Sequence, residues 1–375
     1  MTGEGNGETL YLSKDHRLWI VVTETMNLDL GAALLNNPLK RRVDRRGRSP
    51  ISHLTERTMP AGAAEPRKKR YEVKNWKRYN EALVNRGDFT FYFSEEVVDA
   101  WEHENEAKKN GRPFTYSDVA IETLLTIREL FRLPYRQTEG FGRALAKLLD
   151  AGVAIPHHTS LVKRAAKLKV SIDIDPAKGP IDVVVDSTGL KVFGDGEWHR
   201  KKHGVDKRRT FRKVHLAVDP ASHAIVAQLL TESSMHDATP VKPLLEQVEQ
   251  EVQTFYGDGA YDTWAVREHL EEERIHQIIP PRKNAVIRQH GNSSADPIER
   301  DECLRQIRRD GKKSWKEAIG YHRRSLAETA MSRLKGAFGD RLKNREPRNQ
   351  ATELALRCKI LNAFVAIGMP LNIWG

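Results

Sequence analysis

The sequence predicts an α/β domain that follows a mostly helical domain and a basic N-terminal extension. Residues 71–170 carry apolar positions at helical spacing, and from residue 180 onward the pattern changes to short runs of β-branched and apolar residues. Residues 1–70 sustain neither period. With 375 residues, of which 39% are hydrophobic, the chain is long enough for two or three domains with sizeable cores.

The extension, residues 1–70, is predicted to be poorly ordered. It contains the basic runs Lys40–Arg48 and Arg67–Arg70 between brief apolar segments. These runs either contact DNA or form a solvated tail.

Residues 71–175 are expected to form the helical domain. Ser117 or Asp118 can cap a first helix, whose apolar residues follow the 3.6-residue period until Pro134 interrupts it. A second helix is expected over Phe141–Leu149.

A third helix is expected over Leu161–Leu168, with Thr159 or Ser160 as its cap. It carries Lys163 and Arg164, so the three helices are compatible with a helix-turn-helix whose last helix enters the major groove of DNA. A three-helix bundle with one charged face and no DNA contact fits the same pattern.

The α/β domain is expected over residues 176–365. The run Val183–Val185 is typical of a central strand buried on both faces. The expected strands are Ile181–Asp186 with its extension Leu190–Phe193, Phe211–Val218, Ile225–Thr231, Thr254–Gly257 and Ile275–Pro280. The expected helices are Ala238–Val252, Thr263–Glu273 and Tyr321–Phe338. A basic insertion at 282–320 precedes the last helix, and residues 366–375 are expected to be a C-terminal tail.

The charge balance indicates a polyanionic partner. The chain has 62 Lys and Arg against 51 Asp and Glu, a net charge of +11. Such a balance suggests nucleic acid first and an acidic membrane surface second, although solvated basic faces give the same count. No apolar run approaches the roughly 18 residues of a membrane span, and Cys303 and Cys358 are too few for a disulfide framework. We therefore expect a cytoplasmic protein.

Two aspartates lie where strands are expected to be buried. Asp186 follows Val183–Val185, and Asp258 follows the strand that ends at Gly257. A carboxylate at such a place is costly unless it is hydrogen-bonded, protonated or bound to a metal. Strand ends also line the usual ligand crevice of open α/β sheets. The alternative is that each aspartate only caps the turn that follows it.

Four polar residues share one stripe of the last predicted helix. At 100° per residue, Tyr321, Arg324, Glu328 and Lys335 lie close together on the helix surface, opposite an apolar stripe. Any surface helix can show such a stripe. Its distinctive feature is one carboxylate held among a tyrosine, an arginine and a lysine.

These residues carry a resemblance to a known family. Tyr321-x2-Arg324-x3-Glu328-x6-Lys335 resembles the Y-R-E-K signature of the DDE transposases of bacterial insertion sequences, in the four/five superfamily. The segments that also resemble this family are the first-aspartate strand Val184–Lys191, the hairpin Lys202–Leu216, the second-aspartate motif Gly257–Asp262, the glutamate helix Ser325–Met331, and Tyr71–Asn80 with Pro156–Arg164. The resemblance covers roughly residues 71–365.

The resemblance implies a ribonuclease-H-like catalytic domain in which Asp186, Asp258 and Glu328 are both catalytic and metal-binding. They would hold two Mg²⁺ ions, which Mn²⁺ could replace, since hard cations choose oxygen ligands. Asp262 is the nearest competitor of Asp258, but we expect it to cap the helix that follows.

The resemblance also implies double-stranded DNA as the partner, both at the element ends and at the target, and a homodimer that holds two ends together in a nucleoid-associated complex. Residues 199–213 contain eight Lys or Arg against one acid, and residues 282–320 contain ten against six. The residues expected to contact DNA are Tyr321, Arg324, Lys335, Arg200, Lys201, Lys202, Arg208, Arg209, Lys163 and Arg164. Trp198 and Trp315 could stack on an unpaired base, although packing within the protein is the favoured interpretation.

Three functions remain open at this point. The first is a transposase that cuts at element ends and joins the 3′-ends to new DNA. The second is a DNA-binding repressor derived from such an element, and the third is a metal-dependent nuclease that does not join ends. The presence of all three acids disfavours the repressor.

Overall fold

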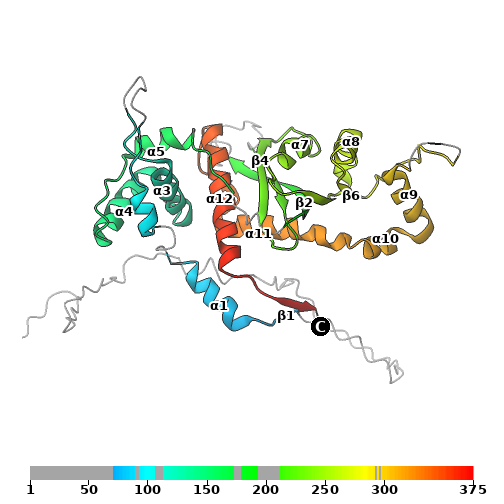
Figure 1. The fold of residues 1–375 in the computed structure, drawn as a ribbon, viewed down its shortest axis with the longest axis horizontal. Coiled ribbons are helices and arrows are strands. Elements are labelled where there is room, and N and C mark those ends of the chain that lie inside the picture. Colours follow the sequence, from blue (N-terminus) through cyan, green and yellow to red (C-terminus); the bar gives the residue numbers. More distant parts are fainter. Residues whose placement is uncertain are drawn as a thin grey trace, which may run out of the picture. The chain divides into compact units, whose positions relative to one another are not determined.

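A computed structural model describes residues 71–88, 93–105, 113–172, 179–192, 211–291, 294 and 297–374. Its centre is a six-stranded mixed sheet in the order β4-β3-β2-β5-β6, with β7 paired to the far end of β2 (Figure 1). The strands are β2 (Ile181–Val192), β3 (Phe211–Val218), β4 (Ile225–Glu232), β5 (Val252–Tyr256), β6 (His276–Ile278) and β7 (Arg341–Leu342). The first three are antiparallel neighbours, whereas β5 and β7 run parallel to β2 and β6 runs parallel to β5.

Both faces of the sheet are covered, which explains the continuous apolar run in β2. Val184 and Leu190 pack in a cluster with residues of α11 (Ser325–Phe338) and α12 (Pro347–Ile367). Val183 and Val185 point to the opposite face, where the cluster includes α7 (Val241–Leu245) and α8 (Trp264–Glu272). The expected central strand is thereby confirmed, and even-numbered residues of β2 face α11.

The helices before the sheet are α1 (Trp76–Asn85), α2 (Glu95–Asp99), α3 (Asp118–Leu130), α4 (Tyr135–Leu148) and α5 (His158–Ala165). Ser117 caps α3 as predicted, because its side chain accepts from the backbone N–H of Ala120. The helix expected over Phe141–Leu149 begins six residues earlier, directly after Pro134, which stands at its N-cap.

The expected cap of the third helix is wrong. His157, and neither Thr159 nor Ser160, is the N-cap of α5, and its side chain accepts from the N–H of Thr159. A histidine imidazole can act as this acceptor, so the helix begins three residues earlier than the serine and threonine pattern suggests.

The helix expected over Ala238–Val252 is also wrong in extent. Only Val241–Leu245 is helical, and Val252 is the first residue of β5, where it pairs with Ile181. Strand pairing in the sheet therefore overrides the helical period of this segment. The helix expected over Tyr321–Phe338 begins as the 3₁₀ turn η4 (Tyr321–Arg324) before α11. The expected basic insertion contains α9 (Glu299–Asp310) and α10 (Lys312–Ala318).

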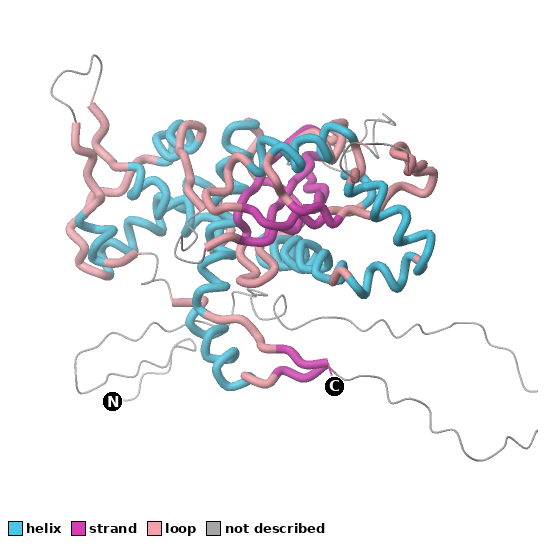
Figure 2. The backbone as a smooth tube through the Cα atoms, turned by 45° about the vertical axis from the view of Figure 1, so that its right-hand side comes forward, coloured by secondary structure: helices cyan, strands magenta, loops and turns pink. Residues whose placement is uncertain are grey.

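The last helix, α12, contributes to the core of the α3–α5 region as well as to that of the sheet. Leu356 belongs to the cluster formed by Ile121, Leu124 and Leu161, while Leu354 belongs to the cluster on the sheet. Near the chain end, β8 (Asn372–Trp374) pairs antiparallel with β1 (Tyr71–Val73), and Figure 2 shows the two strands side by side. The sequence pattern gave no sign of this pairing.

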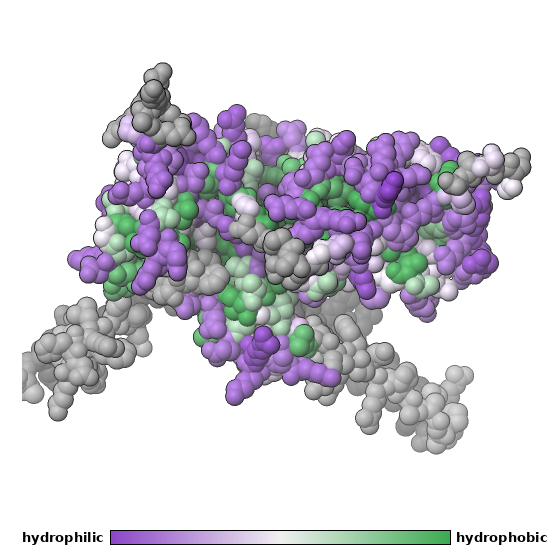
Figure 3. Space-filling model, viewed as in Figure 1, coloured by the Kyte–Doolittle hydropathy of each residue, from purple (hydrophilic) through white to green (hydrophobic). Residues whose placement is uncertain are grey.

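Hydrophilic residues dominate the described surface on the face drawn in Figure 3. Within the described part of the chain, no helix has the length and apolar character needed to span a bilayer.

Candidate active site

Asp186 and Asp258 are brought together by the parallel pairing of β2 and β5. Val184 lies opposite Tyr256, and each aspartate follows two residues later in its own segment. Among the described residues, the pairing of β2 with β5 ends at this point, and β2 pairs again on this side with β7 only from Lys191 onward. The aspartates therefore lie where an edge of the central strand is open, which is the usual place for a ligand crevice.

Asp186 is held by one hydrogen bond and one ion pair. Its Oδ1 accepts from the Ser187 N–H at 2.8 Å, and its Oδ2 lies 3.2 Å from Nη1 of Arg324. Burial raises the pKa of this carboxyl above its usual value, and the nearby charges of Asp258 and Glu328 add to the rise, while Ser187 and Arg324 oppose it. The three acids thus influence one another electrostatically.

Asp258 stands at the end of β5 and also caps a turn. Its Oδ1 accepts from the N–H of Ala260 at 2.8 Å, at the start of the short 3₁₀ segment η3 (Gly259–Tyr261). The capping role that the sequence allowed is therefore real. Because that bond uses Oδ1, the other carboxylate oxygen remains for a ligand.

Glu328 reaches the same place from α11. Arg324, one turn earlier, donates through Nη2 to Oε1 of Glu328 and through Nη1 to Oδ2 of Asp186. A guanidinium thus bridges two of the three acids. Lys335, further along the helix, donates from Nζ to Oγ1 of Thr188 on β2 at 2.6 Å. The polar stripe of α11 therefore faces β2, and the cations expected to clamp DNA phosphates contact protein groups here.

Tyr321 lies beside this cluster on η4. Its ring packs at 5.9 Å between centroids from that of Trp315, and Nζ of Lys316 lies 4.9 Å from its centroid. Burial raises the pKa of Tyr321 to about 12. Trp315 is only 3% exposed, so its ring packs within the protein, as favoured, and offers no open face to a base.

Asp262 is excluded as the second acid by its partners. Its side chain is 1% exposed, and Oδ1 accepts from Arg267 and Arg300, each at 3.0 Å, while Oδ2 accepts from the N–H of Arg282. The cap of α8 is Thr263, so the capping role expected for Asp262 is wrong. Asp262 instead anchors the segment that follows β6.

The expected DNA-contacting residues outside α11 differ in their surroundings. Lys163 is exposed on α5, whereas Arg164 pairs with Asp118 at 2.5 Å and lies over the ring of Phe114. Arg164 therefore supports the helix packing. Trp198, Arg200, Lys201, Lys202, Arg208 and Arg209 lie outside the described residues.

Another group of possible metal ligands lies in the helical region. Glu139, His157 and His158 offer donor atoms that all lie within 4.8 Å of one another. However, Oε2 of Glu139 accepts from the backbone N–H of His158 and lies 2.8 Å from its Nδ1, while Oε1 accepts from Arg143. Both oxygens already serve the start of α5, so we interpret this cluster as a helix-capping network.

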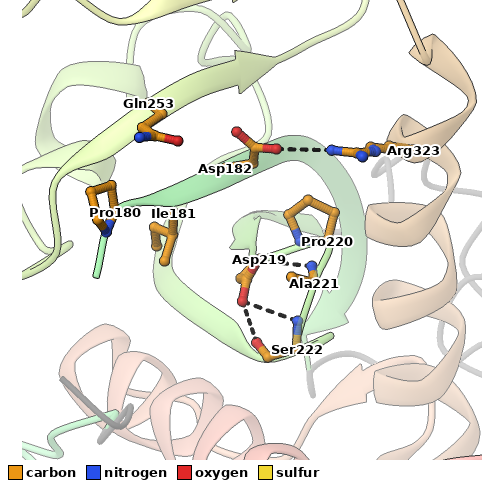
Figure 4. Close-up of a pocket in the computed structure, with 9 residues that line it drawn as sticks. All are labelled: Pro180, Ile181, Asp182, Asp219, Pro220, Ala221, Ser222, Gln253 and Arg323. Atoms are coloured by element: carbon orange, nitrogen blue, oxygen red, sulfur yellow. Dashed lines mark hydrogen bonds and ion pairs between the residues drawn. The ribbon is translucent and has the colours of Figure 1, made fainter. Parts of the chain in front are cut away.

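A cavity of about 550 Å³ lies at the beginning of β2 (Figure 4). Asp182 and Arg323 form an ion pair at 2.9 Å on one side, and Asp219 on the other accepts from Ala221 and Ser222 within its own turn. These acids are used by the fold, and none of the three site carboxylates lines this cavity.

Two polar residues near the site were not singled out from the sequence. Thr188 accepts a hydrogen bond from Nζ of Lys335. Asp237, in the loop after β4, accepts a hydrogen bond from the hydroxyl of Ser187. The alternation of β2 gives only a weak signal for these contacts. It places Thr188 on the same face as Asp186, and Ser187, the partner of Asp237, on the opposite face.

Comparisons with known proteins identify a family for this chain. Two family models, each described as "Transposase DDE domain", match residues 84–195 and 177–363. Among solved structures, the chain is similar to a piggyBac transposase synaptic complex with hairpin DNA, with 11% identity and a TM-score of 0.37 over 79% of this chain and 77% of that chain. A likeness this distant carries no conclusion. The two family matches span both the helical region and the sheet.

Proposed function

The chain belongs to the DDE transposases, which are polynucleotidyl transferases and endonucleases, and from this premise we propose that it is the transposase of a bacterial insertion sequence. It binds the terminal inverted repeats, cleaves the DNA at the element ends and joins the 3′-hydroxyl ends to target DNA. The observation that supports this most is the meeting of Asp186, Asp258 and Glu328 at the open edge of β2.

The donor set fits divalent metal ions. It consists of carboxylates, which hard cations prefer, and two of them already hold a cation, the guanidinium of Arg324. We propose that Asp186, Asp258 and Glu328 hold Mg²⁺, with Mn²⁺ as a substitute. The metal would stabilise charge on the attacking and leaving oxygens of the phosphoryl transfer.

The chain's own groups prepare this site. The Ser187 N–H and the Ala260 N–H each hold one oxygen of an aspartate, so the carboxylates keep defined orientations. Arg324 can move from the carboxylates to a DNA phosphate once another cation neutralises them, since a guanidinium suits both partners. This proposal retains Arg324, Lys335 and Tyr321 as DNA contacts.

The strand order supports a ribonuclease-H-like fold and the Y-R-E-K assignment. Three antiparallel strands followed by two parallel ones agree with the order read from the sequence. Arg324 and Lys335 contact Asp186 and Thr188 of β2, and Glu328 contacts Arg324.

Double-stranded DNA is the proposed partner, with two copies of the chain holding two ends. The net charge of +11 supports a polyanion, and the exposed Lys163 on α5 supports contact through the helical region. The basic segment that contains Arg200, Lys201, Lys202, Arg208 and Arg209 is also proposed to contact the DNA.

A strand-transfer assay tests the proposal. DNA fragments from both sides of the reading frame, each with one element end, are labelled at the 5′-end of the strand on which cleavage creates the 3′-hydroxyl. They are incubated with the protein, Mg²⁺ and a supercoiled target plasmid. We expect cleavage at both ends and covalent transfer of the label into the plasmid. Cleavage without transfer would indicate a nuclease, and binding without cleavage would indicate a repressor. Either result would contradict the proposal.

A further inference from the structure

The face of the sheet behind the three carboxylates carries a second polar cluster. Side chains alternate along β2, so Asp186 and Thr188 point toward α11 while Ser187 points to the opposite face. On that face Ser187 donates from Oγ to Oδ1 of Asp237 at 2.8 Å. The same oxygen accepts from Nζ of Lys213 on β3 at 3.1 Å.

This cluster is tied to the strands that build the site. Ser187 lies opposite His215, and Gly189 lies opposite Lys213, in the β2–β3 register. Nζ of Lys213 also donates to the carbonyl oxygen of Met235 at 2.6 Å. This hydrogen bond ties the loop after β4 to β3. One carboxylate oxygen therefore joins β2, β3 and this loop.

Asp237 is ionised in this setting. Burial alone would raise the pKa of its carboxyl, but hydrogen bonds from Ser187 and Lys213 and the charge of Lys213 hold the pKa below its usual value. A carboxylate that accepts two hydrogen bonds restrains its donors more firmly than a neutral acceptor would.

Tyr261 gives a separate indication that this cluster and the site adjoin. It is 1% exposed, its hydroxyl has no hydrogen-bond partner among the described residues, and the charges of Asp186, Asp237 and Asp258 all act on it. Tyr261 is therefore close to acids of both the cluster and the site.

We propose that Asp237 is a positioning residue for the three-carboxylate site: it anchors Ser187 and Lys213 from behind the sheet and so fixes the strand segment that carries Asp186. Ser187 is the link, because its backbone N–H donates to Asp186 while its hydroxyl donates to Asp237. Between Val184 and Lys191 the described pairing of β2 is with β3 on one side, so side-chain anchors add restraint along the open edge. Outer-sphere partners of this kind orient metal ligands and set the affinity for the ion.

The inference rests on the proposed function, and its test keeps the two apart. Mn²⁺ binding is followed through the electron paramagnetic resonance signal of free Mn²⁺, with the full chain bound to the flanking DNA. Nicking of the same DNA is measured over a range of Mg²⁺ concentrations. Wild-type protein that neither binds Mn²⁺ nor nicks would contradict the proposed function itself. If the wild type binds Mn²⁺ and nicks the DNA while Asp186→Asn does not nick, the proposed function is supported. The role of Asp237 then depends on its own variants.

Asp237→Ala is expected to weaken Mn²⁺ binding, and to raise the Mg²⁺ concentration for half-maximal nicking, by about 10–100-fold. Its thermal midpoint and its DNA affinity without metal should stay near wild type. Asp237→Asn should recover most of the loss, because its amide oxygen can still accept from Ser187 and Lys213. A purely structural loop anchor would not shift metal affinity in folded protein.

Glu232→Ala is the matched control, since it removes an acid that pairs with a basic residue of the same hairpin, Arg212, at 3.3 Å. It should leave the metal dependence unchanged. Should Asp237→Ala fail to fold, Ser187→Ala deletes one hydroxyl from the same link and must show the same direction of shift. Wild-type metal affinity in folded Asp237→Ala, or in Ser187→Ala, would overturn the proposal.

Discussion

At the scale of single residues, similar side chains serve different purposes according to what surrounds them. Asp258 and Asp262 lie four residues apart, yet one stands at the crevice with a single backbone donor and the other is enclosed by Arg267 and Arg300. The sequence ranks Asp258 above Asp262 because Asp262 is expected to cap the next helix. The structure gives a different reason, because Asp262 is paired with Arg267 of α8 and with Arg300 of α9, which lies 38 residues away in the sequence.

We predict stability losses of different size for substitutions of these two aspartates. Asp262→Ala should lower the free energy of unfolding by about 3–5 kcal/mol, because it leaves the buried Arg267 uncompensated. Asp258→Asn should cost less than about 1 kcal/mol, because asparagine keeps the turn cap. Urea denaturation measures both. Comparable losses in the two variants would contradict the assignment of Asp262 to structure.

Arg324 is predicted to compete with metal for the carboxylates. Arg324→Ala should lower stability by about 1 kcal/mol without Mg²⁺, because Asp186, Asp258 and Glu328 then repel one another. Added Mg²⁺ should raise the melting temperature of this variant more than that of the wild type. Arg323→Ala, which removes the neighbouring pair with Asp182, is the control and should show wild-type Mg²⁺ stabilisation. An identical response in both variants would count against competition.

At the scale of elements, the sheet was more predictable than its connections. Phe211–Val218 matches β3, and the Asp219-Pro220 turn signal marks its C-terminal end. Of the stripe residues on η4 and α11, Arg324 and Lys335 contact β2, and Glu328 contacts Arg324, since helical spacing places the three together. The extent of α7 and the start of α5 could not be predicted from the sequence. The first depends on the pairing of Val252 in β5, and the second on the imidazole of His157, which caps α5.

The element that most depends on distant charges is α12. Arg357, fully buried, pairs with Glu129 of α3 and with Glu353 of its own helix. Lys343, just before α12, lies near these groups, and its Nζ has no hydrogen-bond partner among the described residues. Burial lowers the pKa of Lys343 to about 8. Such a buried network cannot be assembled from sequence, because Arg357 and Glu129 are 228 residues apart.

Lys343 therefore predicts a rise of stability with pH. Above a pKa of about 8 the folded protein carries a neutral amine, while the unfolded chain holds its proton up to about 10.4. The unfolded state then binds more protons, so this group increases the free energy of unfolding between those values. Lys343→Met should remove the increase and be more stable by roughly 1–3 kcal/mol at neutral pH. Denaturation at several pH values measures this, and an unchanged pH slope in the variant would contradict it.

At the scale of the whole molecule, the helical region and the sheet share one helix. Thr352 of α12 donates to the carbonyl of Ala165 at 2.7 Å, and Lys359 pairs with Glu122 at 2.6 Å. The two family matches overlap at residues 177–195. A domain boundary near residue 175 remains a prediction. Because α12 packs against both regions, the stability of each region alone tests whether they are independent.

A fragment of residues 71–175 is predicted to fold poorly by itself. Without α12 it loses Leu356 from its core and leaves Glu129 without Arg357. Its thermal transition, followed by circular dichroism, should be broad and lie below that of the complete chain. A sharp transition at the temperature of the complete chain would show that α12 is dispensable for these helices.

The most direct measurement of the central claim, that three carboxylates form one phosphoryl-transfer site, is single-turnover nicking of the flanking DNA in Mg²⁺. The variants are Asp186→Asn, Asp258→Asn and Glu328→Gln, each of which removes an anionic ligand while nearly preserving volume. We expect all three to bind the DNA with near wild-type affinity and to lose nicking by several orders of magnitude. Wild-type nicking rates in any one of them would contradict the site.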